Sequence, residues 1–237
     1  DLATNAGYAV AITDNVADAG ADKLKAMVDD TTGTKDFSTV AKVTGSVDDI
    51  LAIVRDGQTT LKAGVEFKAT DAGTAAEIGE IKAATSGIVE ATVSDKDMTT
   101  LLDATSGLVA QGASATDKLT IALDDTSATA ANLLALNSVT SLAVDASKVD
   151  TLSGTYSDIS AVLTDEQAGE VNLGAGVDLS VSAATSSPTI TEINTLVTSL
   201  RSTSGLTGKI TATLDDTVSD AQAKTLTTEK TKNDAIT

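Results

Sequence analysis

The chain has 237 residues, of which 41% are hydrophobic but only 2% aromatic, so its core must be built from Val, Ile, Leu and Ala. Its net charge is −18, which argues against nucleic acid and anionic membranes as partners, since both are bound through clustered Lys and Arg. The chain has no Cys and no His, which excludes disulfides and removes the commonest general base and transition-metal ligand.

One short sequence pattern recurs along the chain: apolar residues alternate with polar ones and are followed by an acidic or hydroxyl residue. Alternation of this kind predicts a β-strand with one buried face. The nine segments that carry it are residues 8–14, 40–44, 65–71, 89–95, 119–125, 142–145, 159–165, 177–182 and 210–216. Their irregular spacing predicts insertions at the corners between repeats.

Apolar stripes at helical spacing follow several of these segments. They are Ala75, Ile78 and Ile81; Met98, Leu101 and Leu102; Ala130, Leu133 and Leu134; and Ile190, Ile193, Leu196, Val197 and Leu200. We expect the acid or hydroxyl at each strand end to cap the helix that follows, and Pro188 to mark a helix start. Left-handed helix ends are predicted at Gly57, Gly87, Gly107 and Gly205.

A strand, a crossover helix and a second strand in the same direction predict parallel pairing. The fold class that follows is an α/β solenoid, with a parallel β-sheet on one side and short helices on the other. We expect residues 1–237 to form a single elongated domain of about nine coils. A right-handed parallel β-helix with short helical corners is the alternative. Because the chain begins at Asp1 without Met, we interpret it as processed or excerpted from a longer protein.

Three stretches share a composition rich in Thr, Asp and Ala: residues 123–136 (LDDTSATAANLLAL), 163–168 (LTDEQA) and 214–217 (LDDT). The chain resembles the repeat regions of giant cell-surface proteins of marine cyanobacteria, and of large adhesins and surface-layer-like proteins of other aquatic bacteria. This resemblance covers most of the chain and rests on composition and rhythm rather than on an invariant motif. It implies an extracellular, non-catalytic scaffold and transfers no functional residue.

Carboxylate pairs are weighed as candidates for catalysis. Examples are Asp29-Asp30, Asp48-Asp49, Asp124-Asp125 and Asp215-Asp216. Sequence neighbours on a strand point to opposite faces, so such pairs are not ready-made acid–base dyads. Gly174-Ala175-Gly176 precedes a strand, whereas a phosphate loop follows one. We therefore expect no enzyme, and no catalytic, cofactor-binding or metal-binding residue.

Other ligands are weighed in the same way. Acid-rich corners allow weak calcium association, but neither an EF-hand loop nor a glycine-rich nonapeptide is present. Carbohydrate binding relies on aromatic platforms, and the chain offers only Tyr8, Phe37, Phe67 and Tyr156. Tyr8 and Phe67 lie in strand segments and are expected in the core.

Ice binding would need a flat face of regularly spaced Thr side chains. Predicted outward positions include Thr92, Thr120, Thr211 and Thr213. The same set also includes Lys42, Glu66, Lys68, Glu90 and Asp178, which interrupt a regular array. The pattern therefore does not favour this function.

The function we predict is a non-catalytic extracellular structural repeat protein, the scaffold of a cell-surface layer, stalk or filament. The alternative is an adhesin or phage-fibre-like module that recognises a surface ligand. For the scaffold, the expected partners are further copies of the chain or further repeats of a longer chain. The reason is that the first strand segment leaves a sheet edge without an obvious amino-terminal cap. A polar tail at 225–237 follows the last segment. No apolar run is long enough for a membrane span.

Overall fold

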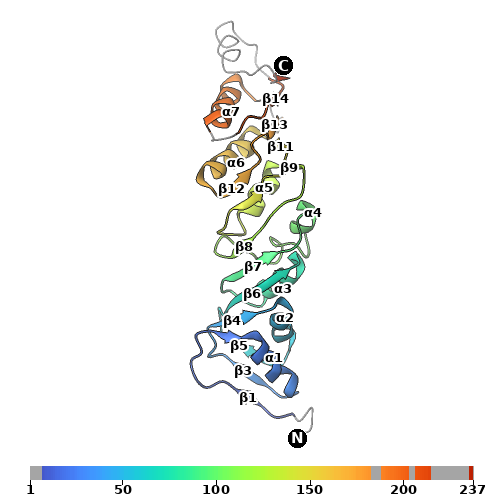
Figure 1. Cartoon of the computed structure of the whole chain (residues 1–237), viewed down its shortest axis with the longest axis vertical. Coiled ribbons are helices and arrows are strands. Elements are labelled where there is room, and N and C mark those ends of the chain that lie inside the picture. The colour runs from blue at the N-terminus through green and yellow to red at the C-terminus, as the bar shows by residue number, and fades with distance from the viewer. Residues whose placement is uncertain (1–6, 183–187, 203–205, 215–234, 237) are drawn as a thin grey trace. The chain divides into compact units, whose positions relative to one another are not determined.

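A computed structural model describes residues 7–182, 188–202, 206–214 and 235–236. The chain divides into two compact units. Unit 1 consists of Asp1–Asp95, Thr99–Ile121 and Val139–Leu142, and unit 2 of Lys96–Met98, Ala122–Ser138 and Ala143–Thr237. In each unit, helices pack beside parallel strands (Figure 1).

Unit 1 contains two parallel sheets, with strand orders β1-β3-β5 and β2-β4-β6-β7-β8. Its elements are β1 (Val10–Ala11), β2 (Ala19–Gly20), α1 (Ala21–Asp30), β3 (Lys35–Phe37), β4 (Lys42–Gly45), α2 (Val47–Arg55), β5 (Thr59–Leu61), β6 (Glu66–Gly73), α3 (Ala75–Ala83), β7 (Val89–Val93) and β8 (Lys118–Thr120). The one-turn helix α4 (Met98–Leu101) follows β7. Helices α1, α2 and α3 pack in that order, and α2 also packs on β4 and β6 (Figure 1).

Unit 2 also contains two parallel sheets, β10-β12 and β15-β14-β13-β11-β9. Its elements are β9 (Ser127–Thr129), α5 (Ala130–Asn137), β10 (Val144–Ala146), β11 (Thr151–Gly154), α6 (Tyr156–Ala168), β12 (Val171–Leu173), β13 (Asp178–Val181), α7 (Ile190–Ser202), β14 (Ile210–Ala212) and β15 (Ala235–Ile236). Helix α6 packs between α5 and α7.

The predicted parallel pairing is confirmed, but the predicted solenoid is wrong, and so is the alternative β-helix. The described strands do not line up in one sheet of nine coils: they are divided among four separate sheets of three, two, five and five strands. A tight turn explains part of this division. After β3, the N–H of Val40 donates to the carbonyl of Phe37 (3.0 Å), and the chain turns so that β3 and β4 join different sheets.

Eight of the nine predicted strand segments overlap an observed strand, and the ninth is wrong. Residues 159–165 lie inside α6, where Ile159, Val162 and Leu163 are buried at helical spacing. Thr155 begins this helix, because its hydroxyl accepts the N–H of Asp158 (3.1 Å). The alternation that suggested a strand is therefore a short-range coincidence within an amphipathic helix.

The four predicted helical stripes are confirmed in α3, α4, α5 and α7. Pro188 lies two residues before α7, outside its first turn. The predicted left-handed helix ends at Gly57, Gly87 and Gly107 are wrong, since these glycines do not have positive φ. Gly169 does (φ 76°), and it ends α6; Gly205 lies outside the described residues.

The two units contain the same succession of elements. The first module, β2-α1-β3-β4-α2-β5-β6, matches the second module, β9-α5-β10-β11-α6-β12-β13. Central strands β4 and β11 each pair with the matching neighbours, β2 and β6 or β9 and β13. Gly45 and Gly154 hold the same place, each against the first residue of the preceding helix, Ala21 or Ala130. The connection Val139–Leu142 alone groups with unit 1.

The core of each unit is aliphatic, as the composition predicts. Its largest apolar side chains are Phe37 and Phe67, both fully buried in unit 1, and the remainder are mainly Leu, Ile and Val. The prediction is confirmed for Phe67 but is wrong for Tyr8, which is half-exposed and donates its hydroxyl hydrogen bond to Asp30. Among the described helices, none is long and apolar enough to cross a bilayer.

Candidate functional site

Three acidic side chains, one inside β6 and two that follow β7 and β8, each cap the helix that precedes that strand. Asp71 Oδ1 accepts the N–H of Val47, which begins α2 (2.7 Å). Asp95 Oδ2 does the same for Ala75 of α3 (2.7 Å), and Asp125 Oδ2 for Met98 of α4 (2.8 Å). A carboxylate there satisfies an orphan N–H and faces the positive end of the helix dipole. The prediction that these acids cap the following helix is therefore wrong, because each one caps the helix before it.

The following helices are capped by hydroxyl groups, but the cap residues are not those that end the predicted strand segments. In each case the hydroxyl accepts the N–H three residues on, and the cap residues are Ser46, Thr74, Thr129 and Thr155. Thr74 forms a full capping box, since Glu77 accepts the N–H of Thr74 in return (2.8 Å). Helices α2 and α3 thus have two caps each, one local and one from the next strand segment.

Three threonines tie a helix end to the preceding strand segment. The hydroxyls of Thr31, Thr85 and Thr140 donate to the carbonyls of Tyr8 (2.6 Å), Val65 (2.5 Å) and Leu119 (2.8 Å). Each hydroxyl also accepts the N–H two residues on, from Gly33, Gly87 and Leu142. We call these contacts threonine ties.

Glycine allows two of these ties to close. A Cβ atom at Gly33 would lie 2.1 Å from the carbonyl oxygen of Tyr8, and one at Gly87 would lie 2.4 Å from that of Val65. No side chain fits at such distances. The Thr-x-Gly sequences at 31–33 and 85–87 therefore mark close main-chain contact, a signal that a search for helix ends misreads.

A buried ion pair joins four segments of unit 1. Lys82 Nζ lies 3.0 Å from Asp117 Oδ1, and the two side chains are 9% and 0% exposed. Asp117 also accepts the N–H groups of Val89 (2.8 Å) and Ser114 (2.9 Å), while Lys82 donates to the carbonyl of Gly87 (2.9 Å). Both side chains of this pair thus bind main-chain groups of unit 1, which is a structural role.

A second pair, Lys35 and Asp56, attaches β3 to the end of α2. The Nζ–Oδ2 distance is 3.1 Å, and Lys35 is only 2% exposed. Burial alone would raise the pKa of Asp56, but hydrogen bonds from Thr59 and Lys35 outweigh it and hold the pKa below its ordinary value. The charged form of Asp56 is therefore the one that the fold stabilises.

The acid pairs singled out in the sequence are separated by the structure into individual contacts. Asp29 pairs with Lys25, and Asp30 accepts from Tyr8. Asp48 and Asp49 lie in the first turn of α2. Asp124 pairs with Lys148 (2.5 Å) whereas Asp125 caps α4, and Asp215-Asp216 lie outside the described residues. In the part of the chain that the structure describes, no three acids gather as a metal site would require.

The outward faces of the two large sheets differ in chemistry. In unit 1, one in-register row across β4, β6, β7 and β8 consists of Thr44, Lys68, Glu90 and Lys118. In unit 2, the corresponding row across β9, β11, β13 and β14 consists of Thr129, Ser153, Ser180 and Thr211. The charges that interrupt the predicted Thr array thus lie mainly on unit 1. Thr92 and Thr120 are in register with each other, and Thr213 is exposed.

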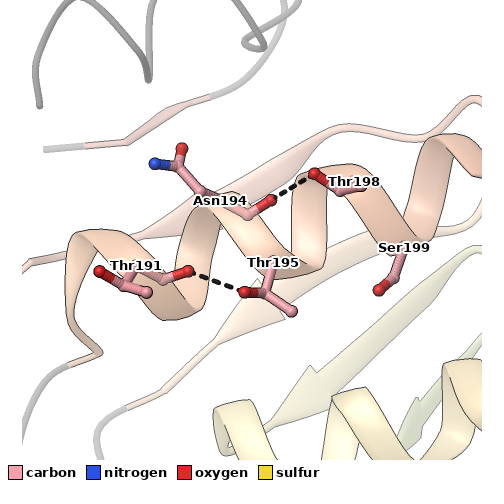
Figure 2. A pocket seen from close by; sticks show the side chains of 5 residues that line it. All are labelled: Thr191, Asn194, Thr195, Thr198 and Ser199. Atoms are coloured by element: carbon pink, nitrogen blue, oxygen red, sulfur yellow. Dashed lines mark hydrogen bonds between the residues drawn. The ribbon is translucent and has the colours of Figure 1, made fainter.

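A shallow hollow of about 330 Å³ lies on α7, lined by Thr191, Asn194, Thr195, Thr198 and Ser199 (Figure 2). Two of its hydroxyls turn back to the helix: Thr195 donates to the carbonyl of Thr191 and Thr198 to that of Asn194, both at 2.9 Å. The lining holds no ionisable group. It therefore offers no acid, base or charged ligand contact.

Comparison with known proteins adds no family to this geometry. No family model, no curated protein and no solved structure matches the chain. The resemblance to cyanobacterial surface repeats therefore stays a prediction.

Proposed function

We propose that the chain is a non-catalytic structural protein of the cell exterior, a scaffold segment of a surface layer, stalk or filament. The inter-segment caps carry this proposal: Asp71, Asp95 and Asp125, which are chemically able to bind or catalyse, are bound to helix N–H groups of a neighbouring segment. Asp117 and Lys82 are used in the same way. The acidic groups thus serve mechanical cohesion.

The net charge of −18 supports an exterior, saline setting. Acidic surfaces repel one another at low ionic strength, and salt screens this repulsion beyond roughly 8 Å at about 0.15 M. In seawater, many copies of such a protein can therefore lie close together on a surface. Localisation in the source cell tests this part of the proposal.

The experiment combines surface labelling with a deletion. A membrane-impermeant amine reagent should label the protein on intact cells, and electron microscopy should show a lost or thinned surface structure in the deletion strain. A cytoplasmic protein used as a control should stay unlabelled. Recovery of the chain only from the cytoplasm, or an unchanged cell surface in the deletion strain, would contradict the proposal.

Self-association is the partner that we propose with this function. Strands β1 and β2 are the outer strands of the two sheets of unit 1, so each has one unpaired side among the described residues. Such edges are templates for pairing with another chain, and the occupant proposed is a second copy or a further repeat. Light scattering at increasing protein concentration in seawater-level salt should show growing assemblies. A strictly monomeric chain would count against this part.

The alternative is a module that recognises a surface, as in an adhesin or phage fibre. The observation in its favour is the neutral row Thr129, Ser153, Ser180 and Thr211, which is in register over four strands. Thr129 caps α5 and Ser153 donates to the carbonyl of Ala128, so Ser180 and Thr211 are the members of the row that would contact a ligand. Binding of the labelled chain to whole cells and to a glycan array would support this function. Replacement of Ser180 by Lys should then abolish binding, whereas Glu90→Lys in unit 1 should not.

A further inference from the structure

Three acidic residues occur within six positions at the C-terminal end of α6 in the second module, and two of them share one hydrogen-bond donor. Asp165 and Glu166 lie in the last turn of α6, and Glu170 follows the left-handed Gly169. The side-chain amide of Asn137, the last residue of α5, donates to Asp165 Oδ2 (3.0 Å) and to Glu170 Oε2 (3.4 Å). One neutral amide thus joins two carboxylates and fixes α6 to α5.

The elements around this cluster offer little positive charge. Helix α5 and strand β12 carry no charged side chain. Glu166 accepts the N–H of Leu173 in β12 (2.8 Å). The other charged groups on elements packed against α6 and its end are Asp158 on α6 itself, Asp145 of β10, Asp178 of β13, which pairs with Lys209, and Glu192 and Arg201 of α7. The negative end of the α6 dipole adds to the repulsion.

In the first module, the acid at the corresponding position, after α2, has a different partner. Asp56 follows α2 where Asp165 ends the corresponding stretch of α6, and it is paired with the buried Lys35. In the second module the position of Lys35 is taken by Val144, which is fully buried. The last turn of α2 also carries Arg55, whereas the last turn of α6 carries no basic residue. One module therefore neutralises the acid with a cation, and the other leaves it beside a second acid.

These surroundings have opposite consequences for proton binding. Burial raises the pKa of Asp165 and Glu170 raises it further, while the hydrogen bond from Asn137 offsets only part of this. A folded-state pKa above the unfolded value means that stability is gained as pH falls through the raised pKa. For Asp56, whose pKa is lowered, stability is present above the unfolded pKa and is lost as pH falls through the folded one.

We propose that Asp165, Asn137 and Glu170 form an acid-responsive latch, which tightens the attachment of α6 to α5 when Asp165 takes up a proton. The mechanism is relief of repulsion: with Asp165 neutral, the Asn137 amide that contacts both side chains faces the single remaining charge of Glu170. The latch is independent of whether the protein is a scaffold or a binding module, because it rests on contacts inside unit 2.

Hydrogen exchange of the full chain, followed by mass spectrometry, tests the latch. After correction for intrinsic exchange, peptides covering Asn137 and the last turn of α6 should be several-fold more protected at about pH 4.5 than at about pH 7, where unperturbed carboxylates are ionised. Peptides from the end of α2 should show no such gain. Asp165→Asn should raise protection of the α6 end at neutral pH and remove its pH response.

Matched variants make the outcome decisive. Asp150→Asn removes an exposed acid from the same module and should leave the pH response of the α6 end unchanged. If Asp165→Asn fails to fold, Glu170→Gln decides, because Glu170 is exposed and its replacement removes the same repulsion. A pH response that survives both variants, or lower protection at neutral pH in either, would overturn the latch.

Discussion

The two modules share one succession of elements but hold their helix ends by different chemistry. In the first, cations meet acids: Lys35 pairs with Asp56, and Arg55 binds Glu80 of the following helix α3 with two hydrogen bonds (2.8 and 2.7 Å). In the second, the buried Val144 takes the position of Lys35, and the neutral Asn137 contacts the acid Asp165. The comparison teaches that charged contacts are exchangeable within this backbone arrangement.

Both modules share the residues that determine the local backbone conformation. Gly45 and Gly154 admit the first turn of the preceding helix, since a Cβ at either would lie 2.4 or 3.1 Å from an alanine Cβ. The side chains of Asp36 and Asp145 each accept an N–H two residues on, both at 3.0 Å, and so form the same turn. Small residues, turns and caps therefore define the module, and charges adjust its stability.

The largest effect is expected where a charge cannot be exchanged. Replacement of Asp117 by Ala leaves Lys82 buried without its counter-ion and removes the acceptor of two main-chain N–H groups. We expect a loss of about 3–5 kcal/mol in the free energy of unfolding of unit 1, measured by urea denaturation. Asp124→Ala, which removes an exposed pair, is the control and should have little effect. Equal effects of the two would show that burial does not govern these charges.

The next effect concerns the threonine ties. Gly87→Ala places a Cβ 2.4 Å from the carbonyl oxygen of Val65, so the contact must open. We expect a cost of about 1–3 kcal/mol, as for other overpacked sites, with lost hydrogen-exchange protection near Val65. Gly57→Ala is matched to it, because a Cβ there meets nothing within 4 Å. The tie would lose its proposed role if both alanine variants were equally stable.

The inter-segment caps should have a smaller effect. Asp95→Ala removes the acceptor of the first N–H of α3, and the helix keeps its local cap at Thr74. We expect a loss of about 0.5–2 kcal/mol, confined in hydrogen exchange to the first turn of α3. Asp150→Ala, which removes an exposed acid elsewhere in the chain, is the control. Loss of protection at α4 instead of α3 would show that the acid caps the helix after it.

The smallest effect is expected at the surface pairs of unit 1. Arg55→Gln breaks the paired hydrogen bonds to Glu80, but both side chains are largely exposed. Its effect on the unfolding midpoint should be small and should vanish in about 1 M salt, where charges are screened within roughly 3 Å. A salt-independent effect would mean that packing of the Arg55 stem, not its charge, matters.

Much of the local structure could be predicted because it depends on neighbours in sequence. The stripes Ala75, Ile78 and Ile81 and Ile190, Ile193 and Leu196 are helices, since periodic burial is a property of the segment itself. Two functional statements remain predictions: that the chain is not an enzyme, and that its function is mechanical. By contrast, Ile159 to Asp165 alternates like a strand but lies in α6, because a short alternation cannot outweigh the Thr155 cap and the longer apolar stripe.

The polar contacts of the candidate site could not be predicted from the sequence pattern. Lys82 and Asp117 are 35 positions apart, and nothing in their local sequence indicates that they meet. The threonine ties had a signal in the sequence, Thr-x-Gly at 31–33 and 85–87, but only Gly87 was singled out, and it was predicted as a helix end. Comparison of the two modules with each other would have found Gly45 and Gly154 and, with them, the shared element order.

The sequence by itself determined the aliphatic core, the direction of strand pairing and most helices, because these follow from composition, from crossover length and from apolar period. Only the tertiary structure decided how the strands are distributed among four sheets and which helix each acid caps. Both depend on single turns such as that between Phe37 and Val40, whose geometry brings distant segments together. A change of direction over four residues costs little locally, but it decides which strands can reach one another.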